Sequence, residues 1–355
     1  MLNVCISFDY EIFMGENYVS EEEVLLKPTE KISQMLKELG VSATFFADVY
    51  CPEAYRRLGK HEFADAFDEQ LRFLVQQGHD VQLHMHPHWK KASQVGARVE
   101  FPREAYRIHN WMEDGSDAVV RQMVHDGVNY LNRVILPVKS DYRCLAFRAG
   151  GYCLQPEKEL VSILYQEGIR IDSSVCQGMA HDGDGMYYDY CTHPKVSNLY
   201  LSNSYGLADN MEKRIPEGVF EVPVAGYSTF PFRIIASKLN ARISNQKPNG
   251  YGMKLEQRQP GLGKRSIIDR VKAAMNATNM VTFDFHNDKS MAYMLKRIAK
   301  EERCNKRDVF LSTIAHPKGQ SDDHIENMKR VVEKLKNTNS IGFVSMRQIA
   351  DQLML

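Results

Sequence analysis

The stretch "EQLRFLVQQGHDVQLHMHPHW" (69–89) joins a segment with helical periodicity to a short apolar run, and the run ends in closely spaced histidines. Gly78 stands where the helical pattern stops, and glycine is the residue that most often ends a helix. The run "DVQLH" (80–84) has the length and apolar content of a strand. This stretch therefore predicts a helix followed by a strand whose C-terminal end carries His84.

The same unit recurs along the chain. The helical pattern "EKISQMLKELG" precedes the apolar run "VSATFFA" (41–47). Further runs of strand length lie at 3–8, 145–148, 168–172, 219–224, 280–285, 309–315 and 341–346. Helices that alternate with strands indicate a parallel sheet, either open or closed into a barrel. We expect an α/β fold formed by one domain over residues 1–355, with two insertions at about 90–140 and 176–275, where this rhythm is interrupted.

Composition excludes several classes of protein. Lys plus Arg and Asp plus Glu both number 45, so the chain has no overall charge that would attract nucleic acid. The N-terminus has no basic segment before its apolar run, and no stretch approaches the length of a membrane span. The seven cysteines form no C-x-x-C pair. We expect a protein of a reducing, cytoplasmic compartment that has no disulfides.

Polar residues follow the predicted strands at the points where the strands end. Each of these positions lies at or just past the C-terminal end of a different apolar run: Asp9, His84, Arg148, Asp172, Asp284 or His286, and His316. Barrels and doubly wound sheets bring these ends together at one edge, where they carry their chemistry. His84 and His88 are four residues apart and can reach one metal ion, while Asp9 and Glu11 can supply an anionic ligand.

Five motifs resemble those of a known family. In this order along the chain they are "SFDYE" (7–11), "GHDVQLHMHPH" (78–88), "FRAGGY" (147–152), "IDSS" (171–174) and "IAHPK" (314–318). Together they resemble the polysaccharide deacetylases, the NodB-homology family of carbohydrate esterase family four. The resemblance implies a distorted (β/α) barrel of about seven parallel strands. It also implies removal of acetyl groups from N-acetylated sugars with a divalent metal, usually Zn²⁺.

The resemblance assigns roles to individual residues. Asp9 matches the catalytic base and Arg148 the arginine that orients it, while Asp172 matches the acid that pairs with His316, the general acid. The metal ligands would be Glu11, His84 and His88, and backbone N–H groups at Gly151 or Tyr152 would stabilise the oxyanion. The remaining candidates, expected to contact substrate or support the site, are His86, Trp89, Asp284 and His286. The chain departs from the usual pattern at Tyr10, which separates two acids that are usually adjacent, and in lacking a tryptophan after Asp172.

The sequence therefore predicts a zinc-dependent N-deacetylase in which metal-bound water attacks an acetamido sugar, a precursor of cell-surface glycan such as lipopolysaccharide or capsule. Residues 233–272 carry ten Lys or Arg against two acids. They are either a solvated face or a site for the phosphates of a nucleotide-linked or lipid-linked sugar. Two alternatives remain. One is another C–N hydrolase of allantoinase or amidohydrolase type, and the other is a catalytically dead glycan-binding barrel.

Overall fold

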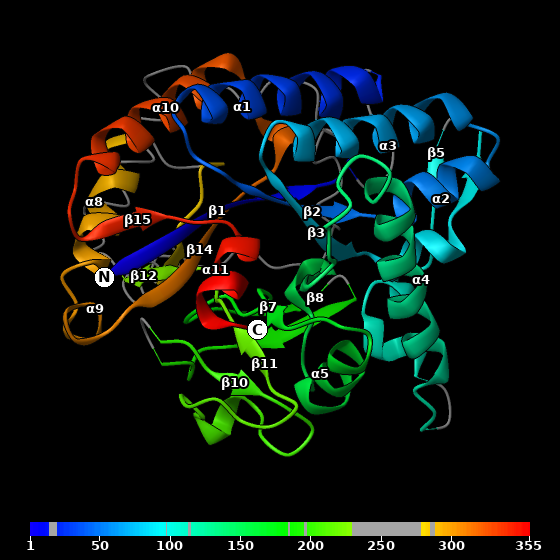
Figure 1. Ribbon diagram of the computed structural model, residues 1–355. Helices are drawn as coiled ribbons and strands as arrows, with labels where there is room; N and C mark the ends of the chain where they lie inside the picture. The colour runs from blue at the N-terminus through cyan, green and yellow to red at the C-terminus, as the bar shows by residue number, and fades with distance from the viewer. Residues whose placement is uncertain are drawn as a thin grey trace, which may run out of the picture.

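A computed structural model describes residues 1–13, 20–96, 98–112, 115–183, 185–194, 197–228, 278–284 and 288–355. Within these residues the main sheet has nine strands in the order β10-β11-β7-β6-β3-β2-β1-β14, with β15 also paired to β1 (Figure 1). Their bounds are β1 (Leu2–Tyr10), β2 (Thr44–Asp48), β3 (Asp80–Met85), β6 (Ala146–Ala149), β7 (Ile171–Asp172), β10 (Tyr200–Leu201), β11 (Val219–Glu221), β14 (Val309–Ala315) and β15 (Ile341–Phe343). Every pair is parallel except β10 with β11.

Single β-bridges join the two sides of the curled sheet. Val224, just after β11, forms parallel bridges both to Cys176, beyond β7, and to Ser312 in β14. The predicted distorted barrel is confirmed. The strand count exceeds the expected seven because β10 adds to one margin of the sheet and β15 pairs only with residues 2–4 of β1.

Helices surround the sheet. They are α1 (Lys27–Glu38), α2 (Tyr50–Arg57), α3 (His61–Gln76), α4 (Ala118–Ile135), α5 (Glu157–Gln166), α8 (Asp288–Ile298), α9 (Glu302–Lys306), α10 (Asp322–Lys336) and α11 (Met346–Leu353), with a π-helical turn over Glu22–Leu26. Figure 1 shows α8, α10, α1, α3, α4 and α5 following one another around the outside of the strands.

Helix α3 shows the apolar pattern that packs a helix against the sheet, since Phe63, Phe67, Leu71 and Leu74 recur at helical spacing and are buried. The chain leaves α3 through Gly78, whose φ of 89° suits glycine.

The two faces of β1 explain where the site forms. Leu2, Val4, Ile6, Phe8 and Tyr10 belong to the large apolar core that includes the surrounding helices. The alternate residues point to the other face, where Cys5 joins a second cluster of buried residues from β2, β6, β7, β11 and β14. Ser7 and Asp9 share the face of Cys5, so they lie on the inner side of the sheet toward the C-terminal end of β1.

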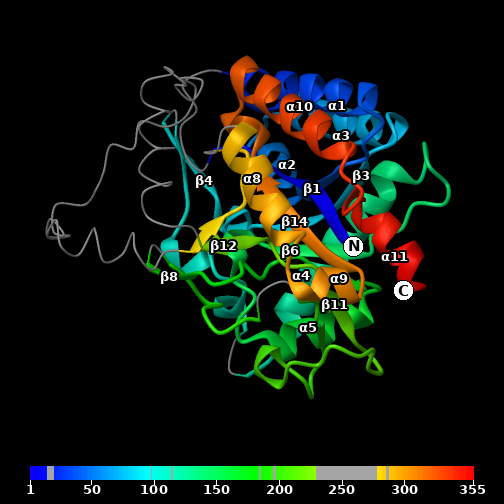
Figure 2. The same cartoon turned by 90° about the vertical axis from the view of Figure 1, so that its left-hand side faces the viewer.

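Three antiparallel two-stranded sheets lie outside this scaffold. They are β4 (Ser93–Val95) with β5 (Arg98–Glu100), β8 (Ala180–Gly183) with β9 (Met186–Asp189), and β12 (Gly226–Ser228) with β13 (Thr278–Met280). Figure 2 places β4, β8 and β12 on one side of the molecule.

Part of the expected first insertion belongs to the scaffold itself, because α4 packs against α3, α5 and β3. The basic stretch 233–272 lies outside the described residues. No helix in the described ranges is both long and apolar enough to cross a membrane.

Candidate active site

Asp9 and Arg148 form a buried ion pair inside the barrel. Nη1 of Arg148 lies 2.6 Å from Oδ1 of Asp9, and the arginine side chain is fully buried. The guanidinium also donates to Oγ of Ser7, Ser173 and Ser312 and to the carbonyl of Ser173. Burial alone would raise the pKa of Asp9, but the charges of Arg148 and two nearby histidines lower it below its usual value. Asp9 is thus held as a carboxylate in a fixed orientation.

Glu11, His84 and His86 form a buried group with the chemistry of a metal site. One oxygen of Glu11 and one ring nitrogen from each histidine lie within 4.8 Å of one another. Oε2 of Glu11 is 2.6 Å from Nε2 of His86 and 3.5 Å from Nε2 of His84. A carboxylate and two imidazoles are a common protein ligand set for Zn²⁺.

The hydrogen bonding of His84 fits this interpretation. Its Nδ1 lies 2.9 Å from the carbonyl of Arg148, which can only accept a proton, so Nδ1 carries the hydrogen. Its buried Nε2 makes no hydrogen bond to any part of the chain that the structure describes. A histidine anchored through one nitrogen, with the other nitrogen aimed into a polar group, has the arrangement typical of a metal ligand.

The structure places His88 outside the group of Glu11, His84 and His86. Its ring is fully buried and packs against Phe101 and Tyr106, with centroids 4.2 and 4.7 Å away. Burial lowers the pKa of His88 to about 2, so the ring is neutral. The physical reason lies in the backbone. His86 is still extended and keeps the two-residue alternation of β3, whereas His88 lies in a short 3-10 helix (Pro87–Lys91) that turns it away.

His316 pairs with Asp284 and not with Asp172. Its Nδ1 is 2.8 Å from Oδ2 of Asp284, and its Nε2 lies 3.7 Å from Oδ2 of Asp9 and 3.6 Å from Oε1 of Glu11. Burial would lower the pKa of His316, but the charge and hydrogen bond of Asp284 raise it above its usual value. The side chain is 27% exposed, so it borders both the acidic pair and solvent. His286, the other candidate on this segment, lies outside the described residues.

Asp172 has a different set of partners, which explains why it is not the partner of His316. Its carboxylate accepts the backbone N–H and the hydroxyl of Ser174, both within 2.9 Å. Glu221 of β11 lies near it, and both acids are fully buried. Burial raises the pKa of Asp172 and, together with the charge of Asp172, raises that of Glu221 well above its usual value. The surroundings of these two acids therefore favour their protonated, uncharged forms.

The glycines of "FRAGGY" give the site its shape. A Cβ on Gly150 would lie 2.5 Å from the carbonyl oxygen of Met85 and 2.7 Å from Nδ1 of His86, so only glycine leaves room for His86. Gly151 and Tyr152 both have positive φ, 58° and 60°. A bulky residue with positive φ is uncommon and is found where function requires the backbone geometry. The turn after β6 is thus held in an unusual conformation beside His86.

Two residues near the site were missed in the sequence. Asp48, at the end of β2, accepts the indole N–H of Trp89 at 2.7 Å and the backbone N–H of His86 at 3.3 Å, and burial raises its pKa to about 6. Trp89 is therefore a buried anchor of this turn. Lys318 lies 2.5 Å from Oε1 of Glu11. Asp48 follows the same strand-end rule as the other candidates, and Lys318 belongs to the quoted motif "IAHPK".

The comparisons with known proteins show similarity in fold and not in sequence. No protein-family model and no curated protein sequence matches the chain. Among solved structures, the one described as Puue allantoinase is 12% identical, with 99% of this chain and 89% of that chain covered and a TM-score of 0.50.

Two further structures are described as polysaccharide deacetylases, the family that the sequence motifs resemble. The protein from Mycobacterium smegmatis is 12% identical (99% and 90% covered, TM-score 0.49). The protein from Pseudomonas aeruginosa PAO1 is 13% identical (99% and 90% covered, TM-score 0.48). These similarities concern the barrel, so the reaction has to be argued from the residues of the site.

Proposed function

We propose that this protein is a metal-dependent hydrolase of amide bonds that removes the acetyl group from an acetamido sugar. One observation carries the proposal. A carboxylate held by Arg148 and a histidine held by Asp284 face each other, with Oδ2 of Asp9 3.7 Å from Nε2 of His316, beside the group of Glu11, His84 and His86. Metal-dependent amide hydrolysis requires a general base, a general acid and a set of metal ligands close together.

The ligand set proposed here is Glu11, His84 and His86. The ligand atoms of these three buried residues lie within 4.8 Å of one another, which supports it. A divalent ion such as Zn²⁺ would supply Lewis acidity at the acyl carbonyl and lower the pKa of the attacking water. Asp9 accepts the proton of that water, since Arg148 keeps the carboxylate ionised and oriented. General base assistance of this kind contributes about 10²–10⁴ in rate.

His316 donates a proton to the departing nitrogen. Asp284 holds Nδ1 of His316 and favours the protonated ring, so Nε2 presents the acidic hydrogen toward the space beside Asp9. We assign oxyanion stabilisation to the backbone N–H groups of Gly151 and Tyr152, which form the positive-φ turn after β6. The products are acetate and a free amino sugar.

The choice of an acetamido sugar rests on the resemblance of the five motifs to the polysaccharide deacetylases. We propose a small precursor of cell-surface glycan, joined to a nucleotide or lipid phosphate, and a cytoplasmic site of action. The basic stretch 233–272 supports a phosphorylated substrate through its charge alone.

The solved structure named as an allantoinase favours a second candidate. That enzyme's name implies a substrate with a ureide C–N bond, and the same base, acid and ligand set would serve that chemistry. A non-sugar amide is therefore the alternative substrate class.

Acetate release separates the two candidates. Purified protein loaded with zinc would be offered N-acetylglucosamine, its uridine-diphosphate-linked form, chitin oligomers and allantoin, with Asp9→Asn as the control. We expect acetate from at least one acetamido sugar and a loss of about 10²-fold or more in Asp9→Asn. Turnover of allantoin alone would favour the second candidate. A protein that binds no metal and turns over none of these compounds would contradict the proposed hydrolase, and binding of the same sugars would then test the glycan-binding alternative.

A further inference from the structure

Lys318 reaches the proposed metal site from the turn that follows β14. It lies two residues beyond His316 in a short 3-10 helix (Pro317–Gly319) that brings it to the end of β1. Its Nζ is 2.5 Å from Oε1 of Glu11 and 3.3 Å from the carbonyl oxygen of Ile12. The side chain is only 14% exposed. A partly buried lysine thus contacts a proposed metal ligand directly.

The two oxygens of Glu11 serve different partners. Oε1 contacts Lys318 and lies 3.6 Å from Nε2 of His316. Oε2 is the oxygen that faces His84 and His86. The single negative charge of this carboxylate is therefore shared between the amino group of Lys318 and the position of the metal ion.

We propose that Lys318 draws the charge of Glu11 away from the ion site, so that a divalent ion there is bound more weakly and remains a stronger Lewis acid. The inference rests on the proposed metal site. Two like charges a few ångströms apart in a buried region repel each other strongly, because little water screens them. An ion that receives less negative charge from its ligands polarises a carbonyl more effectively.

A purely positioning role for Lys318 predicts the opposite result. If the lysine only held Glu11 in place, its loss would let the carboxylate move, and both metal affinity and turnover would fall. If Lys318 competes for the charge of Glu11, its loss strengthens metal binding while turnover falls. The direction of the change in metal affinity therefore separates the two roles.

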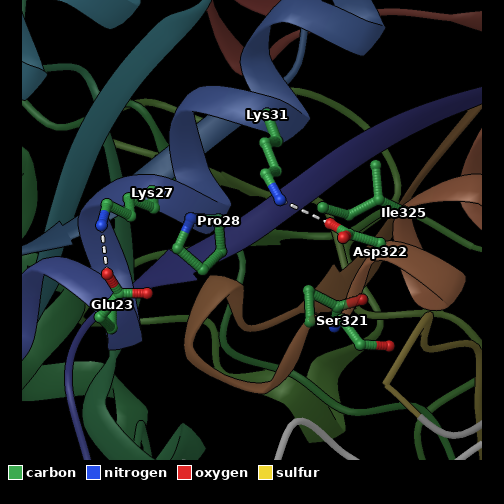
Figure 3. A pocket seen from close by; sticks show the side chains of 8 residues that line it. Glu23, Lys27, Pro28, Lys31, Ser321, Asp322 and Ile325 are labelled. Atoms are coloured by element: carbon green, nitrogen blue, oxygen red, sulfur yellow. Dashed lines mark hydrogen bonds and ion pairs between the residues drawn. The ribbon is translucent and has the colours of Figure 1, made fainter. Parts of the chain in front are cut away.

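The experiment measures zinc affinity by competition with a chromophoric chelator for the wild type, Lys318→Met, Lys318→Gln and Lys318→Arg. The control is Lys31→Met, which removes an exposed lysine 2.7 Å from Asp322 (Figure 3). We expect Lys318→Met and Lys318→Gln to bind zinc roughly tenfold more tightly or better. Lys318→Arg keeps the charge and should stay near the wild type, as should Lys31→Met. With any substrate that the wild type turns over, kcat should fall in the neutral variants.

Unchanged or weaker zinc binding in both neutral variants would overturn the role of Lys318 and leave the proposed hydrolase intact. Absence of zinc binding in the wild type and in every variant would instead remove the proposed function, and this inference with it. Two neutral variants guard against a folding defect in one of them, since Gln retains a polar end beside Glu11. Circular dichroism of each zinc-free variant shows whether it is folded.

Discussion

Asp284 holds His316 through two hydrogen bonds at once: Oδ2 lies 2.8 Å from Nδ1 of the ring, and Oδ1 accepts the backbone N–H of the same residue at 2.9 Å. Gln320 donates to Oδ1 as well, at 2.7 Å. Ring and backbone are thus tied to one carboxylate, and Nε2 is left pointing toward Asp9 and Glu11.

The first prediction concerns Asp284→Asn beside Asp172→Asn. Asp284 raises the pKa of His316, so its removal should lower that pKa. A general acid works only while protonated, and activity is lost as pH rises through its pKa. The alkaline limb of kcat/KM should therefore move to lower pH in Asp284→Asn, with a loss of about tenfold or more at neutral pH. Asp172→Asn should leave the alkaline limb of kcat/KM at the pH of the wild type. A shift of that limb in Asp172→Asn, and not in Asp284→Asn, would show that Asp172 is the partner of His316.

The second prediction compares His86→Ala with His88→Ala in zinc stoichiometry. His86 belongs to the group with Glu11 and His84, whereas His88 lies among Phe101 and Tyr106. We expect His86→Ala and His84→Ala to lose zinc and His88→Ala to retain about one ion per chain. Elemental analysis after gel filtration measures the ratio. Loss of zinc in His88→Ala but not in His86→Ala would return the ligand role to His88.

The third prediction is that Gly150→Ala damages the ion site more than the fold. The added Cβ would lie 2.7 Å from Nδ1 of His86, so the ring must move. Zinc affinity should fall at least tenfold, because a ligand displaced by even a small distance no longer completes the set. Gly78→Ala is the matched control. Its Cβ meets nothing within 4 Å, but its φ of 89° is strained, so it should cost about 1 kcal/mol of stability with zinc binding unchanged.

The fourth prediction concerns stability against pH in Glu221→Gln. Burial and the charge of Asp172 raise the pKa of Glu221 in the folded protein above its value of about 4.3 in the unfolded chain. A carboxyl with a raised pKa contributes stability below its unfolded pKa and loses that contribution as pH rises through the folded pKa. Gln resembles the protonated acid and does not ionise. Urea unfolding should show that the stability of Glu221→Gln relative to the wild type increases from pH 4 to pH 8. A constant difference would mean that Glu221 does not titrate on unfolding.

The scaffold could be predicted because its signals are local. Alternation of helix and strand periods, with Gly78 ending a helix, predicted β1, β2, β3 and β14 in their observed places. The rule that chemistry gathers at strand ends also placed Asp9 and Arg148 close enough to pair, although they come from different strands.

The details of the site depended on local geometry that spacing alone does not fix. A His-x-x-x-His spacing brings both rings to one side in a regular helix or a regular strand, but not where the chain changes from strand to 3-10 helix between the two residues. Here His86 stays extended and the 3-10 helix begins at Pro87, so the structure places His86, and not His88, in the group with Glu11 and His84. The partner of His316 depended on which strand end lay beside β14. Thr282, two residues before Asp284, bridges to Ile314 of β14, while Asp172 points toward Glu221 of β11.

The pairing of β1 with β14 affects how the chain can fold during its synthesis. Phe8 pairs with Ala315, so β1 meets this neighbour only after the intervening residues have been synthesised. Until then an entirely buried strand has an open edge, the kind of surface that recruits other chains and calls for chaperones. Closing so long a loop also slows folding. Asp9 lies in β1 and His316 directly follows β14, so the proposed base and acid come together only when these two strands pair.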